Sequence, residues 1–291
     1  MQFTTTRRSF VTTAAVASTA LAAGFPVLRT VTAQDADYPE LTIIATDHAF
    51  DMAATAESGY TRLTLDNQGQ ADHHAIFFRI NDDATPEQFQ EALMSGDLGA
   101  VLGVSSAYGG PNAGPGGAAS VIAWLDPGAY VAVCVVPDEN GVPHAAHGMV
   151  APLEVTESDA ALDAPATDAT VSLIDMAFND LPAEVAAGPI TWAVINAGPQ
   201  LHELVILRLA EGLDVDGLMA ILTGEGDATP DAAAGPPFMA VAGTAPMSQG
   251  AINFLEAELE PGAHVAICFI PDVETGMPHF LMGMIEGFSV I

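Results

Sequence analysis

The feature that most constrains this chain is an internal repeat that contains its only two cysteines. In each copy the cysteine is followed by a histidine and then, after four intervening residues, by a methionine. These residues are Cys134, His144 and Met149 in the first copy, and Cys268, His279 and Met284 in the second. A thiolate, an imidazole and a thioether form the soft ligand set that suits copper in an electron-transfer site. The repeat therefore predicts both a duplicated architecture and a candidate chemistry.

The repeat extends well beyond this loop. In each copy an Asn-x-Gly turn leads, after three intervening residues, to a second histidine. The turns and their histidines are Asn67–Gly69 with His73, and Asn196–Gly198 with His202. Leu125–Cys134 also aligns with Leu259–Cys268 without a gap, and each copy has a normal domain length. We therefore predict two tandem domains at residues 38–156 and 169–291, joined by a linker at residues 157–168 that is rich in Ala, Asp and Pro.

Short apolar runs such as Leu41–Ile44 and Thr61–Leu65 are separated by Asn, Gly, Pro and Asp in both copies. This pattern favours an all-β fold of antiparallel sandwiches over a doubly wound sheet. One short helical insertion is expected in each copy, from Pro86 (capped by Thr85) to Gly96 in the first, and over Val215–Leu222 with Gly224 at its end in the second. The Gly- and Pro-rich stretches Gly109–Gly117 and Pro230–Pro237 are expected to be surface loops.

The N-terminal segment has the pattern of an export signal. Arg7 and Arg8 precede an apolar run at Val11–Phe25 and a small-residue exit at Val31–Ala33. This arrangement resembles a twin-arginine (Tat) signal peptide, here residues 1–33. It implies export to a periplasmic or extracellular location. An uncleaved anchor or a disordered tail are the alternatives.

The chain beyond Ala33 is strongly acidic. It carries three arginines, no lysine and all 37 acidic residues. Such a surface repels nucleic acid and anionic membranes, so no nucleic-acid partner and no membrane insertion after signal removal are expected. It would attract a protein partner with a basic patch, and adaptation to a salty exterior explains the acidity equally well.

The two cysteines fall at matching positions of separate copies, so a disulfide between them is not expected. Each is a free thiol or a metal ligand. A free cysteine is often simply a small buried hydrophobe, and each histidine and methionine has a similar structural alternative as a turn-fixing or core residue.

Taken together, these residues resemble the cupredoxins, the blue-copper family that includes plastocyanin, azurin and halocyanin. The resemblance lies in the Asn-x-Gly turn before the first histidine and in the Cys, His, Met order of the later loop. It implies two tandem Greek-key β-sandwich domains and copper as the cofactor. Carried over residue by residue, it implies one site at His73, Cys134, His144 and Met149, and a second at His202, Cys268, His279 and Met284.

The sequence departs from the family in one spacing. Cupredoxins leave two to four residues between the cysteine and the following histidine, whereas this chain leaves nine in the first copy and ten in the second. The longer segment either folds back as an ordered turn that returns the histidine to the site, or carries the histidine away.

Some neighbouring positions differ between the copies. His74 corresponds to Glu203, so symmetry favours His73 as the ligand of the first copy. His48 and His147 correspond to Met176 and Met282. These two positions form either an accessory site or a variable surface.

The leading hypothesis is an exported copper-binding protein that carries electrons, or holds and delivers copper, without turning over a substrate. No Cys-His dipeptide, His-x-His pair, Gly-x-Ser-x-Gly elbow or phosphate-binding Gly-Lys motif is present, so we expect no enzyme activity. A redox or copper-exchange protein is the expected partner. The alternative is a metal-free extracellular interaction or structural module that keeps the sandwich.

Overall fold

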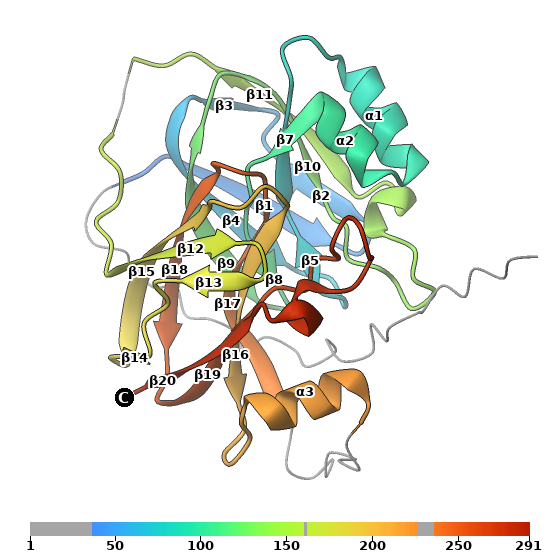
Figure 1. Cartoon of the computed structure of the whole chain (residues 1–291). Coiled ribbons are helices and arrows are strands. Elements are labelled where there is room, and N and C mark those ends of the chain that lie inside the picture. The colour runs from blue at the N-terminus through green and yellow to red at the C-terminus, as the bar shows by residue number, and fades with distance from the viewer. Residues whose placement is uncertain (1–36, 160–161, 226–235) are drawn as a thin grey trace, which may run out of the picture.

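The computed structural model describes residues 37–159, 162–225 and 236–291. The expected signal peptide at residues 1–33 lies outside these residues, as do residues 160–161 of the expected linker and most of the stretch Pro230–Pro237. Strands dominate the described chain and form layered sheets, which confirms the all-β prediction (Figure 1). The domain boundaries themselves stay a prediction.

One large sheet contains strands from both halves of the chain (Figure 1). Its eight strands are, in order, β13 (Ala177–Asn179), β12 (Ala169–Ile174), β15 (Gly188–Asn196), β18 (Ile252–Leu259), β9 (Ala118–Leu125), β4 (Gly59–Asn67), β1 (Glu40–Thr46) and β2 (Ala49–Met52). The halves meet where β9 and β18 pair antiparallel, with Val121 opposite Leu255. The sequence did not predict this shared sheet.

Each half adds a five-stranded sheet of its own. In the first half it contains β3 (Thr55–Glu57), β11 (Val150–Thr156), β10 (Gly128–Val133), β6 (Ile76–Ile80) and β7 (Ser105–Ala107). In the second half it contains β14 (Glu184–Val185), β20 (Ile285–Val290), β19 (Gly262–Ile267), β16 (His202–Leu209) and β17 (Phe238–Met247). A short pair, β5 (His73–His74) with β8 (Asn112–Ala113), completes the first half.

The two halves repeat one pairing scheme. The first strand pairs parallel with the long strand that ends in the Asn-x-Gly turn, as β1 does with β4 and β12 does with β15. The strand that ends at the cysteine pairs antiparallel with two neighbours, as β10 does with β6 and β11 and β19 does with β16 and β20. The sequence repeat therefore corresponds to a repeat of topology.

A single apolar core joins the flanking sheets to the shared sheet. Alternate residues of β9 and β18, including Val121, Ala123, Leu255 and Ala257, point into it. Their neighbours in the two strands, Ile122 and Phe254, are also buried and pack in a second cluster, because successive side chains of a strand point to opposite faces. Both cysteines belong to this core, so the sheets themselves place the thiols in an apolar environment.

Polar contacts also join the halves. Arg62 of β4 pairs with Glu256 of β18 at 3.1 Å. The segment Gly109–Gly117 is largely buried between the halves, so the expectation of a surface loop is wrong. Position 110 requires glycine, because its φ is 137° and a Cβ would collide with the carbonyl oxygen of Ala75. Its backbone N–H donates to Asn253 of the other half at 2.8 Å.

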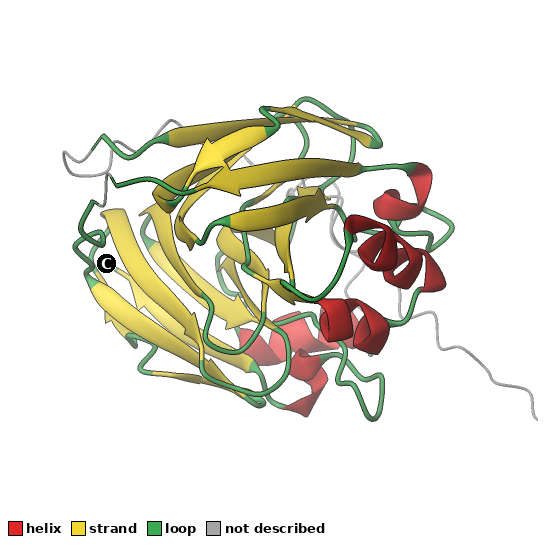
Figure 2. Ribbon diagram, turned by 90° about the horizontal axis from the view of Figure 1, so that it is seen from above, coloured by secondary structure: helices red, strands yellow, loops and turns green. Residues whose placement is uncertain are grey.

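The helices lie on one side of the strand layers (Figure 2). Helix α1 (Pro86–Ser95) begins with a capping box at Thr85 and ends at Gly96, and α3 (Val215–Thr223) ends at Gly224, as predicted. Helix α2 (Leu98–Val104) was not predicted, because its two glycines and absent polar face give no helical pattern. Within the described residues no helix is long and apolar enough to cross a membrane.

The shared sheet and core predict that the halves unfold together. The chain has two tryptophans, Trp124 on β9 and Trp192 on β15, one in each half. In the variants Trp124→Phe and Trp192→Phe of the metal-free protein, we expect the urea transition followed by the remaining tryptophan's fluorescence to coincide with that followed by far-UV circular dichroism. Separate midpoints in either variant would show that the halves are independent.

Candidate metal centres

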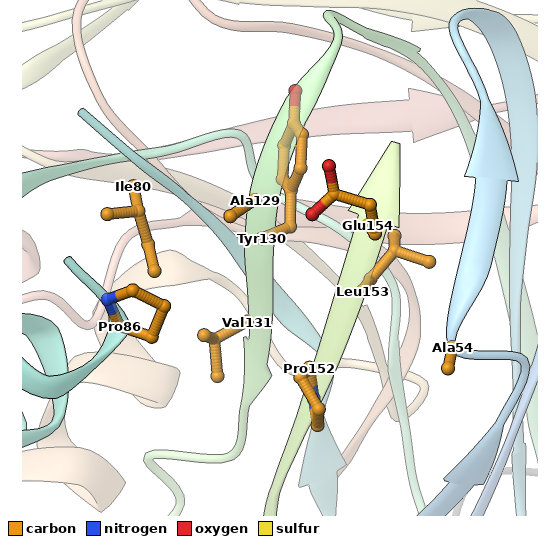
Figure 3. Close-up of a pocket in the computed structure, with 9 residues that line it drawn as sticks. All are labelled: Ala54, Ile80, Pro86, Ala129, Tyr130, Val131, Pro152, Leu153 and Glu154. Carbon is orange, nitrogen blue, oxygen red and sulfur yellow. The ribbon is translucent and has the colours of Figure 1, made fainter. Parts of the chain in front are cut away.

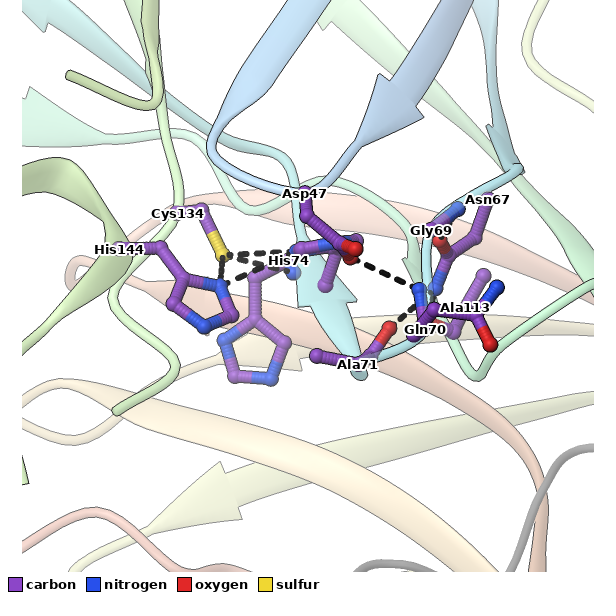
Figure 4. Close-up of polar contacts among 10 residues, drawn as sticks. Asp47, Asn67, Gly69, Gln70, Ala71, His74, Ala113, Cys134 and His144 are labelled. Atoms are coloured by element: carbon purple, nitrogen blue, oxygen red, sulfur yellow. Dashed lines mark hydrogen bonds and ion pairs between the residues drawn. The ribbon is translucent and has the colours of Figure 1, made fainter. Parts of the chain in front are cut away.

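The first histidine of each centre is positioned by the Asn-x-Gly turn at the end of a long strand. The Asn67 side chain accepts from the N–H of Gly69 at 2.9 Å and donates to the carbonyls of Ala71 and Ala113 at 2.8 and 2.9 Å (Figure 4). Asn196 does the same with Gly198, Gln200 and Met247. Both asparagines are fully buried, so their bonds fix the loops that precede the histidines.

A carboxylate lies near the Nε2 atom of each of these histidines. Asp175 Oδ1 lies 3.0 Å from Nε2 of His202, whereas Asp47 Oδ1 lies 3.7 Å from Nε2 of His73. A carboxylate at Nε2 favours the tautomer with the proton on that atom and leaves the Nδ1 lone pair free to bind a metal. A Cβ on Gly198 would lie 2.9 Å from both partners of the second pair, so glycine is required for this contact.

Each cysteine lies at the end of a strand and is fully buried. The Cys134 sulfur follows β10 and accepts backbone N–H groups from His74, at 3.5 Å, and from Val136. The Cys268 sulfur follows β19 and accepts the corresponding groups of Glu203 and Ile270. Two backbone donors directed at each sulfur stabilise a negatively charged thiolate.

The long segment between cysteine and histidine folds back as a tight hairpin. In the first copy His144 N–H donates to the Val136 carbonyl at 2.9 Å, and Ala145 N–H donates to the Cys134 carbonyl at 2.8 Å. The second copy has the same bonds, from His279 to Ile270 and from Phe280 to Cys268. Short 3₁₀ turns, His144–His147 and His279–Met282, then follow. The extra residues therefore lie in the hairpin, and the histidine returns beside the thiol.

The three donors of the first centre form a compact triangle. Cys134 Sγ lies 3.7 Å from Nδ1 of His73 and 3.5 Å from Nδ1 of His144, and the two nitrogens are 3.1 Å apart. The centre of a triangle with these sides lies about 2.0 Å from each atom, near the bond lengths of about 2.0–2.3 Å that metals make to nitrogen and sulfur. The triangle has the size that one metal ion requires.

The second centre repeats this arrangement. Ligand atoms of His202, Cys268 and His279 all lie within 4.8 Å of one another, and Cys268 Sγ is 3.5 Å from Nδ1 of His279. Nδ1 of His202 is buried and has no hydrogen-bond partner among the described residues. Because an unpaired buried nitrogen is costly, the free lone pair of this atom is suited to bind a metal ion.

Burial shapes the protonation of these groups. Burial raises the pKa of the Cys134 thiol to about 11 and also raises that of Cys268, while burial and the nearby His144 lower the pKa of His73 to about 4. The imidazoles are therefore neutral at pH 7 and can donate lone pairs. The thiols stay protonated at pH 7 unless a cation favours the thiolate, so metal binding would release protons.

The two methionines are placed beside the other residues of the predicted sites. Met149 and Met284 are fully buried in the same core as the cysteines. Met149 N–H donates to the His144 carbonyl at 3.1 Å, and Cys134 N–H donates to the Met149 carbonyl at 3.2 Å. Met284 makes the same two bonds with His279 and Cys268. The fold thus brings all eight predicted residues into two groups of four.

Sequence reasoning did not predict the burial of the residues beside the first histidines. His74 and Glu203 project into the protein, and each has a buried side-chain atom without a hydrogen-bond partner among the described residues. Burial raises the pKa of Glu203 to about 7, and it lowers that of His74 to about 4. The available sequence signal was that each directly follows a predicted ligand, His73 or His202.

A shallow pocket elsewhere lacks these features (Figure 3). It lies beside β10 and β11, has a volume of about 190 Å³ and is lined largely by apolar groups such as Pro86, Val131 and Leu153. Glu154 is its only ionisable carboxylate, and none of the eight predicted metal-site residues lines it.

The chain is similar to several solved structures of copper proteins. No protein-family model and no curated protein matches the chain. A reduced auracyanin from Roseiflexus castenholzii is 19% identical and covers 43% of this chain and 98% of its own, with a TM-score of 0.30. A multicopper oxidase is 16% identical over 94% of this chain and 96% of its own, with a TM-score of 0.25. A copper nitrite reductase from Nitrosomonas europaea is 14% identical over 87% and 93%, also with a TM-score of 0.25.

The donor set itself is compatible with copper. Each centre offers two neutral imidazoles and one thiol at buried positions, and a buried methionine is hydrogen-bonded through its backbone to the cysteine and the second histidine. This is the ligand set of blue-copper sites, in which a trigonal His₂Cys group is completed by a weak axial methionine. Copper is therefore the metal that the residues fit, and the unpaired Nδ1 of His202 is the structural sign of that fit.

Asp175 and Asp47 allow a test of whether the carboxylate near Nε2 of each histidine contributes to copper affinity. We expect Asp175→Asn to weaken copper binding at the second centre by roughly 10–100-fold, the usual effect of losing such a partner. Asp47→Asn should have a smaller effect at the first centre, because the Asp47–His73 contact is longer. Competition with a copper chelator measures both. Equal effects would contradict the role assigned to the shorter contact.

Proposed function

We propose that this chain is an exported copper-binding protein that transfers single electrons at two centres. The observation that carries the proposal is the pair of buried His, Cys, His groups, of which the first has the dimensions of a single-ion site. His73, Cys134 and His144 would hold the first ion and His202, Cys268 and His279 the second. Met149 and Met284 would be the weak axial ligands.

The chain's own residues suit electron transfer. A bound copper ion would supply one-electron redox chemistry between its two oxidation states. The Asn67 and Asn196 turns hold one histidine on the sandwich, and the hairpins hold the cysteine and the other histidine by backbone hydrogen bonds. Donors that are fixed before metal binds need little rearrangement when the charge of the ion changes.

We propose that no substrate is turned over. The multicopper oxidase and nitrite reductase above are enzymes by name, but this chain has no His-x-His or Cys-His pair. Within the described residues, the groups of three or more His, Cys, Asp or Glu donors whose ligand atoms all lie within 4.8 Å of one another are the two centres. The copper-loaded protein should therefore show no reductant-dependent oxygen or nitrite consumption above that of free copper.

Export and a basic partner are parts of the same proposal. The twin-arginine pattern at Arg7 and Arg8 supports export. In the described structure each of the three arginines is paired with a carboxylate: Arg62 with Glu256, Arg79 with Asp82 and Arg208 with Glu260. The remaining surface is therefore anionic and suits a redox partner with a basic patch, in an association that weakens with salt.

Copper loading distinguishes this function from a metal-free module. Two equivalents of Cu(II) should bind and produce intense visible absorption from charge transfer between thiolate and metal. Cys134→Ser and Cys268→Ser should each remove one equivalent of coloured copper, and the double variant should be colourless. A wild-type protein that remains colourless and metal-free on elemental analysis would favour the module.

The two centres should differ in how firmly they hold copper. Phe269, Ile270 and Phe280 surround the second hairpin, and Phe280 is buried, whereas the first hairpin carries Ala146 and His147 at exposed positions. A dry apolar surround excludes competing water from a metal site. Copper should therefore leave the Cys268→Ser variant, which keeps the first centre, faster than the Cys134→Ser variant when a chelator is added. The reverse order would contradict this ranking.

A further inference from the structure

A cluster of histidines covers the first centre on its solvent side. His48 and His147 are exposed, and their rings lie 4.7 Å apart between centroids. The His48 ring also meets the buried His144 ring nearly perpendicularly at 5.1 Å. His48 has a φ of 68°, a left-handed conformation that is unfavourable for most side chains. The backbone therefore holds His48 over the buried ligand His144.

A carboxylate completes this cluster. Asp138 Oδ1 accepts the backbone N–H groups of Asn140 and Val142 at 2.8 and 2.9 Å, which fixes the side chain. Its second oxygen, Oδ2, lies 3.1 Å from Nε2 of His147. The hydrogen bonds from the turn hold the pKa of Asp138 near 2, so the group is negatively charged at neutral pH. Two imidazoles and one fixed carboxylate thus gather at one exposed place.

The second copy lacks this arrangement. Met176 and Met282 replace the two histidines, although Met176 keeps the left-handed backbone at φ 63°. Asp272 replaces Asp138, but its Oδ2 accepts from the Gln200 side chain at 3.0 Å. Both carboxylates accept backbone N–H groups of their own turn through Oδ1, but Oδ2 faces an imidazole in the first copy and a side-chain amide in the second. The two copies therefore differ in the side chains at this place, whereas the backbone conformation at His48 and Met176 is the same.

We propose that His48, His147 and Asp138 form an outer Cu(II) site at the mouth of the first centre. Nitrogen and oxygen donors with water access suit Cu(II), whereas the buried thiolate set suits both oxidation states. An ion held there would lie beside the ring of His144. His144 could replace one of the outer ligands and so transfer the ion to the inner centre. This second role, the loading of the inner centre, rests on the proposed function, whereas the existence of the outer site does not.

The test is a titration of copper-loaded protein with further Cu(II), followed by electron paramagnetic resonance. We expect one additional equivalent with a tetragonal spectrum, nitrogen hyperfine structure and no added colour. The double variant His48→Met, His147→Met carries the residues of the second copy, and it should keep the coloured copper but lose the additional equivalent. An additional equivalent that persists in this variant would overturn the site, as would its absence from the wild type.

A matched control tests whether any loss of a histidine has the same effect. His264 is buried away from both centres and corresponds to Tyr130 of the first copy. His264→Tyr should keep the additional equivalent. Loss of that equivalent in His264→Tyr would also count against the outer site, because it would show an indirect effect.

The loading role has its own measurement. In a Cys268→Ser background, where colour reports on the first centre alone, His48→Met, His147→Met should slow the appearance of colour after mixing with Cu(II) and leave its final intensity unchanged. An unchanged rate would overturn the loading role. A colourless parent would instead refute copper binding at the inner centre, while the outer-site titration would remain valid.

Discussion

The burial of facing sulfur and nitrogen atoms is the constraint on which the rest of the structure depends. A buried polar atom without a partner costs about 1–3 kcal/mol. The described structure has seven such side-chain atoms, and six belong to residues at or beside the two centres, the exception being on His264. One of these atoms, Nδ1 of His202, belongs to the donor group of the second centre, so metal binding would offset its cost and stabilise the native state by linkage. The other unpaired nitrogens of the predicted ligands are Nε2 of His73 and of His279, whose Nδ1 atoms face the cysteines.

The turns and hairpins keep this unfavourable arrangement from relaxing. If the loops were free, the histidines would rotate toward water, and the thiols would pack as small hydrophobes. Buried Asn67 and Asn196 bind the turns to neighbouring backbone, and the hairpin bonds at Cys134 and Cys268 fix the other side. The glycine in each turn leaves room for the carboxylate behind the histidine. The local sequence therefore holds the donors in place without a metal.

The sequence predicted features that depend on interactions between nearby residues and missed features that depend on contacts between distant segments. Local signals succeeded for the helix that Thr85 and Gly96 bound. The eight residues singled out from the repeat also lie together in two groups, whereas their role as metal ligands stays a prediction. Long-range features were missed. The pairing of β9 with β18 joins distant segments without a local pattern, and the burial of Gly109–Gly117 depends on that contact. His144 and His279 lie beside the cysteines because of backbone hydrogen bonds in the hairpins, and the number of residues between cysteine and histidine does not reveal these bonds.

Duplication preserved the donors and changed what surrounds them. The same three ligand types recur, yet a buried imidazole, His74, lies beside the first thiol where a buried carboxyl, Glu203, lies beside the second. When Glu203 is ionised, its negative charge near a thiolate–metal group would favour the more oxidised ion, and a neutral imidazole would do so less, because electrostatic interactions are strong where water is excluded. Asp175 also holds His202 more closely than Asp47 holds His73. The same donor residues in the two copies therefore have different electrostatic surroundings, and a duplicated protein can keep its architecture while the surroundings of equivalent residues diverge.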